Sequence, residues 1–191
     1  MVKVIEERKR AASLPPGERR SAIIAATVPL LLADGDMVTT RQIAEASGIA
    51  EGTIFRVFAD KDAVIAAVLE AATDPAPMEE ALRALDATLP LDRVLTEAIE
   101  ILQRRTIELW RLVSSVGPRF RDQVKPLNES PALSAIFKAH RDEISLEPRV
   151  AARHLRALTL ASSHPLLVEV PTPPRKIVSL FLHGVARRSS C

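Results

Sequence analysis

Residues 51–56 have side chains of the types and spacing that a DNA-contacting surface needs. Arg56 carries a planar guanidinium that can donate two hydrogen bonds to guanine, and the Thr53 hydroxyl can bond a base or a phosphate. Gly52 has no Cβ, so its backbone can approach a target closely. Glu51 can accept a hydrogen bond from cytosine N4 or repel the phosphates. These residues predict DNA contact, provided that the local structure presents them on one free face.

Two short apolar segments around a glycine are spaced to present such a face. The first follows Thr39, Gly48 breaks it, and the second runs on to Phe58. Two short helices joined by a tight turn containing glycine form a helix-turn-helix, whose second helix enters the major groove. Thr39 is expected to cap the first helix, and Arg41, one turn in, to clamp a phosphate. The residues that can lock the pair together are Ile43, Ala44, Ile49, Ile54 and Phe58.

The stretch from about residue 18 to 70 resembles the N-terminal domain of the TetR family of bacterial transcriptional repressors. The matching positions, in order, are Thr39, Ile43-Ala44, Gly48-Ile49-Ala50, Gly52-Thr53-Ile54-Phe55, Phe58 and Lys61. Residues 23–35 look like the first helix of that family. The resemblance adds Phe55 and Lys61 to the DNA-binding candidates, with Lys61 contacting a phosphate from the first turn of the next helix.

Three positions depart from the family pattern. Ala50 replaces the usual Ser or Thr N-cap of the recognition helix, a change that costs about 1 kcal/mol. Phe55 lacks the hydroxyl of the usual Tyr, and Val57 stands where a hydrogen-bonding residue is common. These departures leave a second hypothesis open, in which the chain is a helical small-molecule carrier or interaction module that kept the fold without specific DNA binding.

Helical periodicity and prolines predict an all-α protein in two domains. Residues 1–16 are predicted to be a flexible basic arm, 17–73 the helix-turn-helix domain with three helices, and 74–191 a C-terminal helical domain for ligand binding and dimerisation. Prolines at 74–77 suggest the boundary, and Pro29 should kink the first helix or interrupt it. Helices are expected at 17–34, 39–46, 51–58, 60–73, 78–88, 91–116, 131–144, 148–162 and 173–188.

The last two predicted helices suggest how the chain pairs. Gly184 would lie in the middle of the final helix at a cost of about 1 kcal/mol relative to Ala, and a close helix crossing would explain it. The resemblance implies a homodimer through these helices and an enclosed small-molecule effector. Packing within one chain is the alternative, since periodicity cannot distinguish the two. The candidate pocket residues are Trp110, Phe120, Phe137 and His140, and core packing is the alternative for each.

Composition limits the classes of function. The chain of 191 residues is 47% hydrophobic and 26% charged, as in globular proteins. Residues 1–62 contain nine Lys and Arg against nine Asp and Glu, so DNA binding would depend on where the basic residues lie. The single cysteine, Cys191, excludes an internal disulfide and fits a reducing cytoplasm.

No catalytic, metal or cofactor site is expected. The four histidines have no cysteine or carboxylate partners at metal-ligand spacing, and the chain has no nucleophile elbow or glycine-rich phosphate loop. Arg19-Arg20 before the apolar run 22–33 superficially resembles a twin-arginine signal. Pro29 within that run, and the helix-turn-helix pattern that follows it, favour a core helix. No run is long enough to span a membrane, and no membrane partner is expected.

Overall fold

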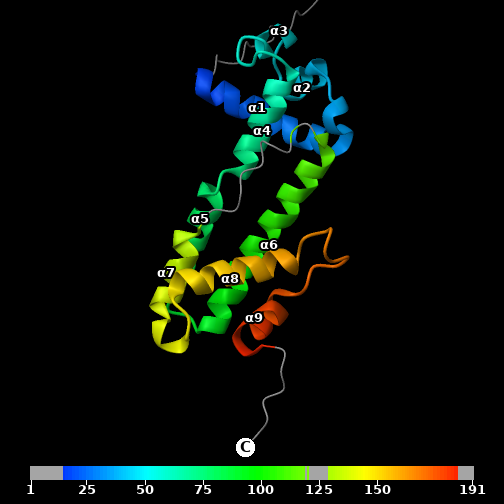
Figure 1. Ribbon diagram of the computed structural model, residues 1–191. Helices are drawn as coiled ribbons and strands as arrows, with labels where there is room; N and C mark the ends of the chain where they lie inside the picture. The colour runs from blue at the N-terminus through cyan, green and yellow to red at the C-terminus, as the bar shows by residue number, and fades with distance from the viewer. Residues whose placement is uncertain (1–14, 119, 121–128, 185–191) are drawn as a thin grey trace, which may run out of the picture. The chain divides into compact units, whose positions relative to one another are not determined.

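The computed structural model describes residues 15–118, 120 and 129–184 (Figure 1). All regular structure within these residues is helical, which confirms the predicted all-α class. The helices in chain order are α1 Pro16–Asp34, the 3₁₀ turn η1 Gly35–Met37, α2 Thr40–Ala46, α3 Glu51–Ile54, α4 Lys61–Thr73, α5 Ala76–Arg83, α6 Leu91–Ser115, α7 Pro131–Ala139, the 3₁₀ turn η3 Arg141–Glu143, α8 Pro148–Ala161 and α9 Pro174–His183. No helix in this part of the chain is long and apolar enough to cross a bilayer.

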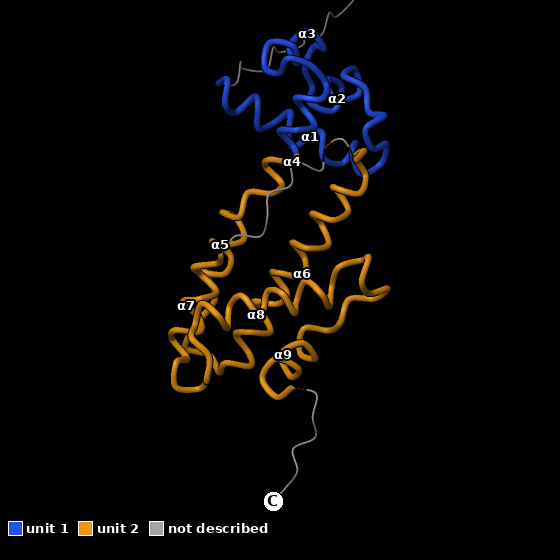
Figure 2. The backbone as a smooth tube through the Cα atoms, in the orientation of Figure 1, with its two compact units in different colours: residues 1–68 blue, residues 69–191 orange. Residues whose placement is uncertain are grey.

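Contacts divide the chain into two compact units, residues 1–68 and 69–191 (Figure 2). The division falls within α4. The proline-rich stretch at 74–77 follows that helix directly and starts α5, where Asp74 accepts a hydrogen bond from the Ala76 amide at 3.0 Å. Most of the predicted arm, residues 1–14, lies outside the described residues.

Unit 1 is organised around one face of α1. Ile23, Thr27 and Leu31 recur every four residues on that face and are fully buried. The buried Thr27 hydroxyl donates to the Ile23 carbonyl at 2.7 Å, which satisfies its polar group within the helix. Pro29 lies inside α1 without ending it, and Pro16 occupies the first turn, where a missing amide proton costs little.

Unit 2 is built on α6, a helix of 25 residues with one apolar face. This helix packs against α5, α8 and α9, while α7 packs against α5 and α8. The ring of the fully buried Phe137 lies 5.8 Å from that of Phe181, which joins α7 to α9. The core consists of Leu82, Leu91, Val94, Leu95, Ala98, Ile99, Leu102, Ala132, Leu133, Ile136, Phe137, Ala151, Ala152, Leu155, Ile177 and Val178.

Several helices of unit 2 are shorter than the sequence predicts. The helix expected at 78–88 ends at Arg83, and Asp86 then accepts both the amide and the hydroxyl of Thr88, which also lowers the pKa of its carboxyl. Such an Asx turn competes with helix. The helix expected at 131–144 ends at Ala139 and is followed by η3.

The prediction for Gly184 is wrong. This glycine follows the last residue of α9 with φ +70°, so it terminates the helix instead of lying in its middle. A Cβ added there would meet nothing within 4 Å among the described residues, so no close helix crossing within this part of the chain explains the residue. Glycine is favoured at this position for its backbone conformation, because it adopts a positive φ at helix C-termini without a steric penalty. Residues 185–188 of the predicted helix lie outside the described residues.

A buried amide fixes the connection between α8 and α9. Gln103 of α6 donates from Nε2 to the Ser163 hydroxyl at 2.9 Å and to the Thr172 carbonyl at 2.8 Å. The Thr172 amide in turn donates to the Ser162 carbonyl at 2.9 Å. Thr172 thus closes the loop just before α9, whose N-cap is Pro173. These bonds set where the two last helices begin and end.

Candidate nucleic-acid interface and ligand pocket

The N-terminus of α2 is held by a reciprocal pair of hydrogen bonds. The Thr39 hydroxyl accepts from the Gln42 amide at 3.2 Å, and the Thr39 amide donates to Gln42 Oε1 at 2.8 Å. This capping box confirms the predicted role of Thr39 and adds Gln42, which the Thr-x-x-Gln spacing could have revealed. Gln42 also donates to Asp34 at 3.0 Å, so it joins α2 to the end of α1.

The turn between α2 and α3 depends on Gly48. Its φ of +66° lies in the left-handed region, which residues with a Cβ rarely adopt. The next amide, that of Ile49, donates back to the Ala44 carbonyl at 3.0 Å and closes the turn. The chain is thereby redirected so that Ile54 is fully buried, as Ile43 is in α2.

The recognition segment has a shorter regular helix than expected. Helix α3 spans only Glu51–Ile54 and has no side-chain cap at Ala50, in line with the missing Ser or Thr there. Phe55, Arg56 and Val57 follow in turn geometry, with the Arg56 amide donating to the Thr53 carbonyl at 3.2 Å. Arg56 therefore lies two residues beyond the end of α3, which is itself a single helical turn.

Most of the expected DNA-contacting side chains are exposed. Glu51, Gly52, Phe55 and Arg56 are exposed, Thr53 is half-buried, and a Cβ on Gly52 would meet nothing within 4 Å. Glu51 is oriented by the Thr40 hydroxyl, which donates to its carboxylate at 2.5 Å. This bond holds the acidic group against α2. Arg41 pairs with Glu45 at 3.1 Å on the surface, a weak interaction that a phosphate can replace.

Lys61 has a partner that the sequence did not reveal. Its Nζ donates to the Asp36 carbonyl of η1 at 2.6 Å, and the residue is half-buried. Asp60 caps the start of α4, because its carboxylate accepts from the Ala63 amide at 2.7 Å. Lys61 therefore joins the start of α4 to η1, and its charge lies beside the first turn of α4, where backbone amides favour anions.

Arg20 is a second unforeseen contributor to this unit. Its guanidinium carbon lies 4.5 Å from the centroid of the Phe58 ring, which is buried. A cation over an aromatic face is stabilising by roughly 0.5–2 kcal/mol. The contact links α1 to the segment that leads from the recognition turn into α4, and so holds that segment against the domain.

Residues 23–68 match the family model described as bacterial regulatory proteins, tetR family. The N-terminal domain is a TetR-family domain. The match begins within α1, continues through the capped α2, the Gly48 turn and α3, and ends within α4. No curated protein matches the sequence.

Solved structures of TetR-type regulators resemble the whole described chain. A TetR/AcrR-family regulator from Thermobifida fusca YX-ER1 has 18% identity and a TM-score of 0.62, covering 89% of this chain and 100% of that one. A putative TetR-family regulator from Mesorhizobium loti MAFF303099 has 14% identity and a TM-score of 0.60, covering 89% and 98%. The Thermus thermophilus FadR repressor, in complex with lauroyl-CoA, has 22% identity and a TM-score of 0.53, covering 90% and 97%. These similarities show the TetR fold.

In the second unit, the four candidate ligand-binding residues have different surroundings. Phe137 is fully buried in the core, and Phe120 is also buried. The Trp110 ring contacts that of His164 at a tilt of 53°, with ring centroids 4.3 Å apart. His140 lies at the end of α7, with its Nδ1 2.8 Å from Glu143, and its buried Nε2 has no hydrogen-bond partner among the described residues. None of the four lines the pocket described next, so their role in ligand binding stays a prediction.

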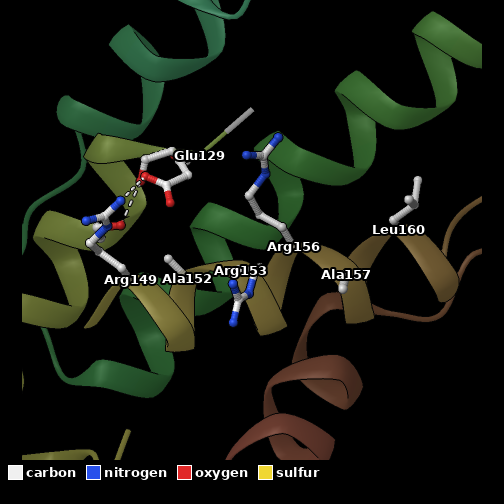
Figure 3. Close-up of a pocket in the computed structure, with 9 residues that line it drawn as sticks. Glu129, Arg149, Ala152, Arg153, Arg156, Ala157 and Leu160 are labelled. Carbon is white, nitrogen blue, oxygen red and sulfur yellow. Dashed lines mark hydrogen bonds and ion pairs between the residues drawn. The ribbon is translucent and has the colours of Figure 1, made fainter. Parts of the chain in front are cut away.

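A pocket of about 210 Å³ lies between α7 and α8 (Figure 3). Its charged residues are Arg149, Arg153, Arg156 and Glu129, with Glu129 and Arg149 joined at 2.5 Å. The remaining wall consists of Ser130, Ser134, Ala152, Ala157 and Leu160. Sequence reasoning sought aromatic side chains and missed this site, although arginines at 149, 153 and 156 share one helical face. No cluster of three or more His, Cys, Asp or Glu among the described residues could hold a metal ion.

Proposed function

We propose that the chain is a TetR-type transcriptional repressor that binds a palindromic operator as a dimer and is released by a small-molecule effector. The observation that best supports this function is that the recognition segment has a buried apolar side and an exposed polar side. Ile54 and Phe58 are buried, while Gly52 and Arg56 are exposed. Such a division fixes the segment to the domain and leaves its polar side for a groove. TetR-family regulators are generally DNA-binding proteins without enzymatic activity, and the proposal includes no catalytic step.

Each contact in the proposed complex follows from the side chain that makes it. Arg56 reads guanine, because its guanidinium is exposed and can donate two parallel hydrogen bonds. Thr39, Arg41 and Lys61 contact phosphates and position the domain without reading sequence. Lys61 keeps its bond to the Asp36 carbonyl, which accepts one of its three ammonium protons and leaves two for a phosphate.

Dimerisation through α8 and α9 is supported by apolar surface on the loop between them. Leu166, Leu167 and Val170 are 73%, 65% and 75% exposed, which is unusual for three large apolar side chains so close in sequence. Association of two copies would cover them. Two recognition segments would then read half-sites about one helical turn of DNA apart.

An effector is supported by relatives of the same fold. The Thermus thermophilus FadR repressor is in complex with lauroyl-CoA in its crystal structure, so the fold accommodates a small molecule. For this chain we assign the effector to unit 2, where the α7–α8 pocket lies. Ligand and operator then affect each other by the same free energy of coupling.

The decisive experiment is selection of duplexes from a random DNA library by the purified full chain, followed by a salt titration of the enriched sequence. We expect a palindrome, bound by two chains, with affinity falling by about 0.9 log units per phosphate contact for each tenfold rise in salt. No enrichment at low salt by a folded, ligand-free protein would reject the repressor and favour the helical carrier.

Two variants separate base reading from positioning. Arg56→Ala should cost about 1–3 kcal/mol on the selected site and relax preference at one base pair, whereas Lys61→Ala should weaken all sequences alike and reduce the salt slope by about 1. The control is Arg104→Ala, an exposed arginine of α6 in the other unit. Equal effects of Arg56→Ala and Lys61→Ala on base preference would refute the role of Arg56. Circular dichroism must first show that Lys61→Ala is folded, because Lys61 also supports η1.

A further inference from the structure

Phe55 is the one aromatic side chain that is exposed in the part of the chain the structure describes. Its ring is 52% exposed, whereas every other aromatic side chain of that part is buried or half-buried. A single exposed apolar side chain is ordinary on a protein surface, so exposure alone assigns no role. The position of Phe55 within the recognition segment, residues 51–58, indicates what the ring contacts.

The backbone around Phe55 places its side chain on the exposed side of this segment. Phe55 has helical φ and ψ of −68° and −10°, and the Phe58 amide donates to the Ile54 carbonyl at 2.9 Å, so the chain keeps a helical course past the end of α3. In such a backbone, residues three and four apart are neighbours on one face. Phe55 is therefore a neighbour of Gly52, and so is Arg56. Ile54 and Phe58 lie on another face and are buried.

Gly52 leaves bare backbone beside both Phe55 and Arg56. A Cβ built on Gly52 would meet nothing within 4 Å among the described residues, so the surface at this position is open. Glu51, four residues before Phe55, has its carboxylate engaged by the Thr40 hydroxyl at 2.5 Å. The exposed face thus presents an apolar ring and a guanidinium next to each other.

A phenyl ring limits what this face can recognise on DNA. The ring has no hydrogen-bond donor or acceptor, so it cannot bond a phosphate or a polar base edge. The apolar group that the major groove offers is the C5-methyl group of thymine, and Phe is among the side chains that contact it. The sugar of the DNA backbone is a second apolar surface, but contact with it carries no sequence information.

We propose that Phe55 reads the 5-methyl group of a pyrimidine in the operator, on a base pair adjacent to the guanine that Arg56 reads. The proposal rests on the repressor function above and adds a specificity-determining residue to it. Successive base pairs are about 3.4 Å apart along the duplex, a step that two neighbouring side chains can span. The ligand class is a 5-methylpyrimidine, which in DNA is thymine or 5-methylcytosine.

The test removes the methyl group and nothing else from the DNA. In the operator obtained by selection, each thymine is replaced in turn by deoxyuridine in both half-sites, and the affinity of the full chain is measured by fluorescence anisotropy. We expect one position at which the replacement weakens binding about fourfold per half-site, or about 15-fold for both, the size of one methyl contact each. At that position, 5-methylcytosine should bind more tightly than cytosine by the same factor. Comparison with thymine then shows which of the two methylated bases the site prefers.

Variants of Phe55 assign the methyl contact to this ring. In Phe55→Ala, replacing the same thymine by deoxyuridine should no longer weaken binding, because the partner of the methyl group is gone. Phe55→Tyr keeps the ring and should keep the discrimination. The matched control is Leu146→Ala, which removes an apolar side chain that is 42% exposed in unit 2 and should leave the discrimination unchanged. If circular dichroism shows that Phe55→Ala does not fold, Phe55→Gln retains helix propensity and should lose the discrimination as well.

Two results would overturn the role of Phe55 while the regulator function stands. If no replacement of thymine by deoxyuridine weakens binding, no methyl group is read. If Phe55→Ala weakens all duplexes alike and keeps the discrimination, the ring packs on the sugar–phosphate backbone. In both cases Arg56→Ala should still relax base preference, which shows that the same segment reads the operator. Absence of any enriched duplex instead rejects the regulator function itself, and the role of Phe55 with it.

Discussion

Replacing Gln103 with Leu should destabilise unit 2 and loosen the connection between its last two helices. The side chain is 8% exposed and makes two hydrogen bonds, to the Ser163 hydroxyl and the Thr172 carbonyl. Leu has a similar size but no donor, so the fully buried Ser163 loses one partner and Thr172 loses another. A buried polar group left without a partner costs about 1–3 kcal/mol, and added apolar burial returns about 1 kcal/mol. Because two groups each lose a partner, the expected net loss is about 1–5 kcal/mol, with a central value of about 3 kcal/mol.

Urea unfolding followed by tryptophan fluorescence measures this loss of stability in unit 2 itself. Trp110 is the only tryptophan, lies on α6 and contacts the ring of His164 near the same loop, so its emission reports unit 2. With a slope of about 1–3 kcal/mol/M, the midpoint should fall by about 1 M. The control is Glu100→Leu, an exposed position of the same helix, with an expected change within about 0.5 kcal/mol.

A double-mutant cycle tests the reasoning behind that magnitude. Ser163→Ala alone should destabilise the unit, but in a chain that already carries Gln103→Leu it should cost about 1 kcal/mol less, because the hydroxyl has lost its donor. An unchanged midpoint and slope for Gln103→Leu would refute the reasoning, as would strictly additive effects of the two substitutions. Light scattering on Gln103→Leu then shows whether the loop supports the proposed dimer.

Three further predictions concern the supports of the two units. Thr39→Ala should lower the stability of unit 1 by about 1 kcal/mol while Thr39→Ser retains it, measured by hydrogen exchange of the α2 amides; equal protection in both variants would exclude the capping role. Gly48→Ala should lower the stability of unit 1 by about 1–2 kcal/mol and Gly48→Asn by less, because a Cβ disfavours the positive φ while the space around it is open. Thermal unfolding followed by circular dichroism measures both losses, and a larger loss for Asn than for Ala would contradict the prediction. Phe137→Ala should cost about 3–5 kcal/mol by urea titration of Trp110 emission, and a loss below about 1 kcal/mol would mean that the core repacks around the cavity.

The elements of unit 1 could be predicted because their signals are local. A cap at Thr39, a glycine in the left-handed region at position 48 and a cap at Asp60 act within three or four residues of chain, and all three are present. The departure at Ala50 also has a local result, a single helical turn without a side-chain cap. Phe58 is buried, as its spacing from Ile54 predicts.

The ends of the helices in unit 2 were harder to predict because competing local structures are close in free energy. A helical period continues past Arg83 and past Ala139, but an Asx turn at Asp86 and the η3 turn end each helix earlier. Gly184 was expected inside a helix because its spacing from Ile177 fits the apolar face. Its φ of +70° shows that it ends the helix instead.

The sequence by itself determined the all-α class, the order of the helix-turn-helix elements and the residues that display Arg56, since each depends on propensity, capping and periodicity along the chain. Tertiary structure alone decided which distant groups meet. Lys61 meets Asp36 across 25 residues, Gln103 meets Thr172 across 69, and Glu79 meets Ala132 across 53. The pocket beside Arg156 arises in the same way, because burial and charge balance depend on the neighbours that packing supplies, and periodicity carries no information about them.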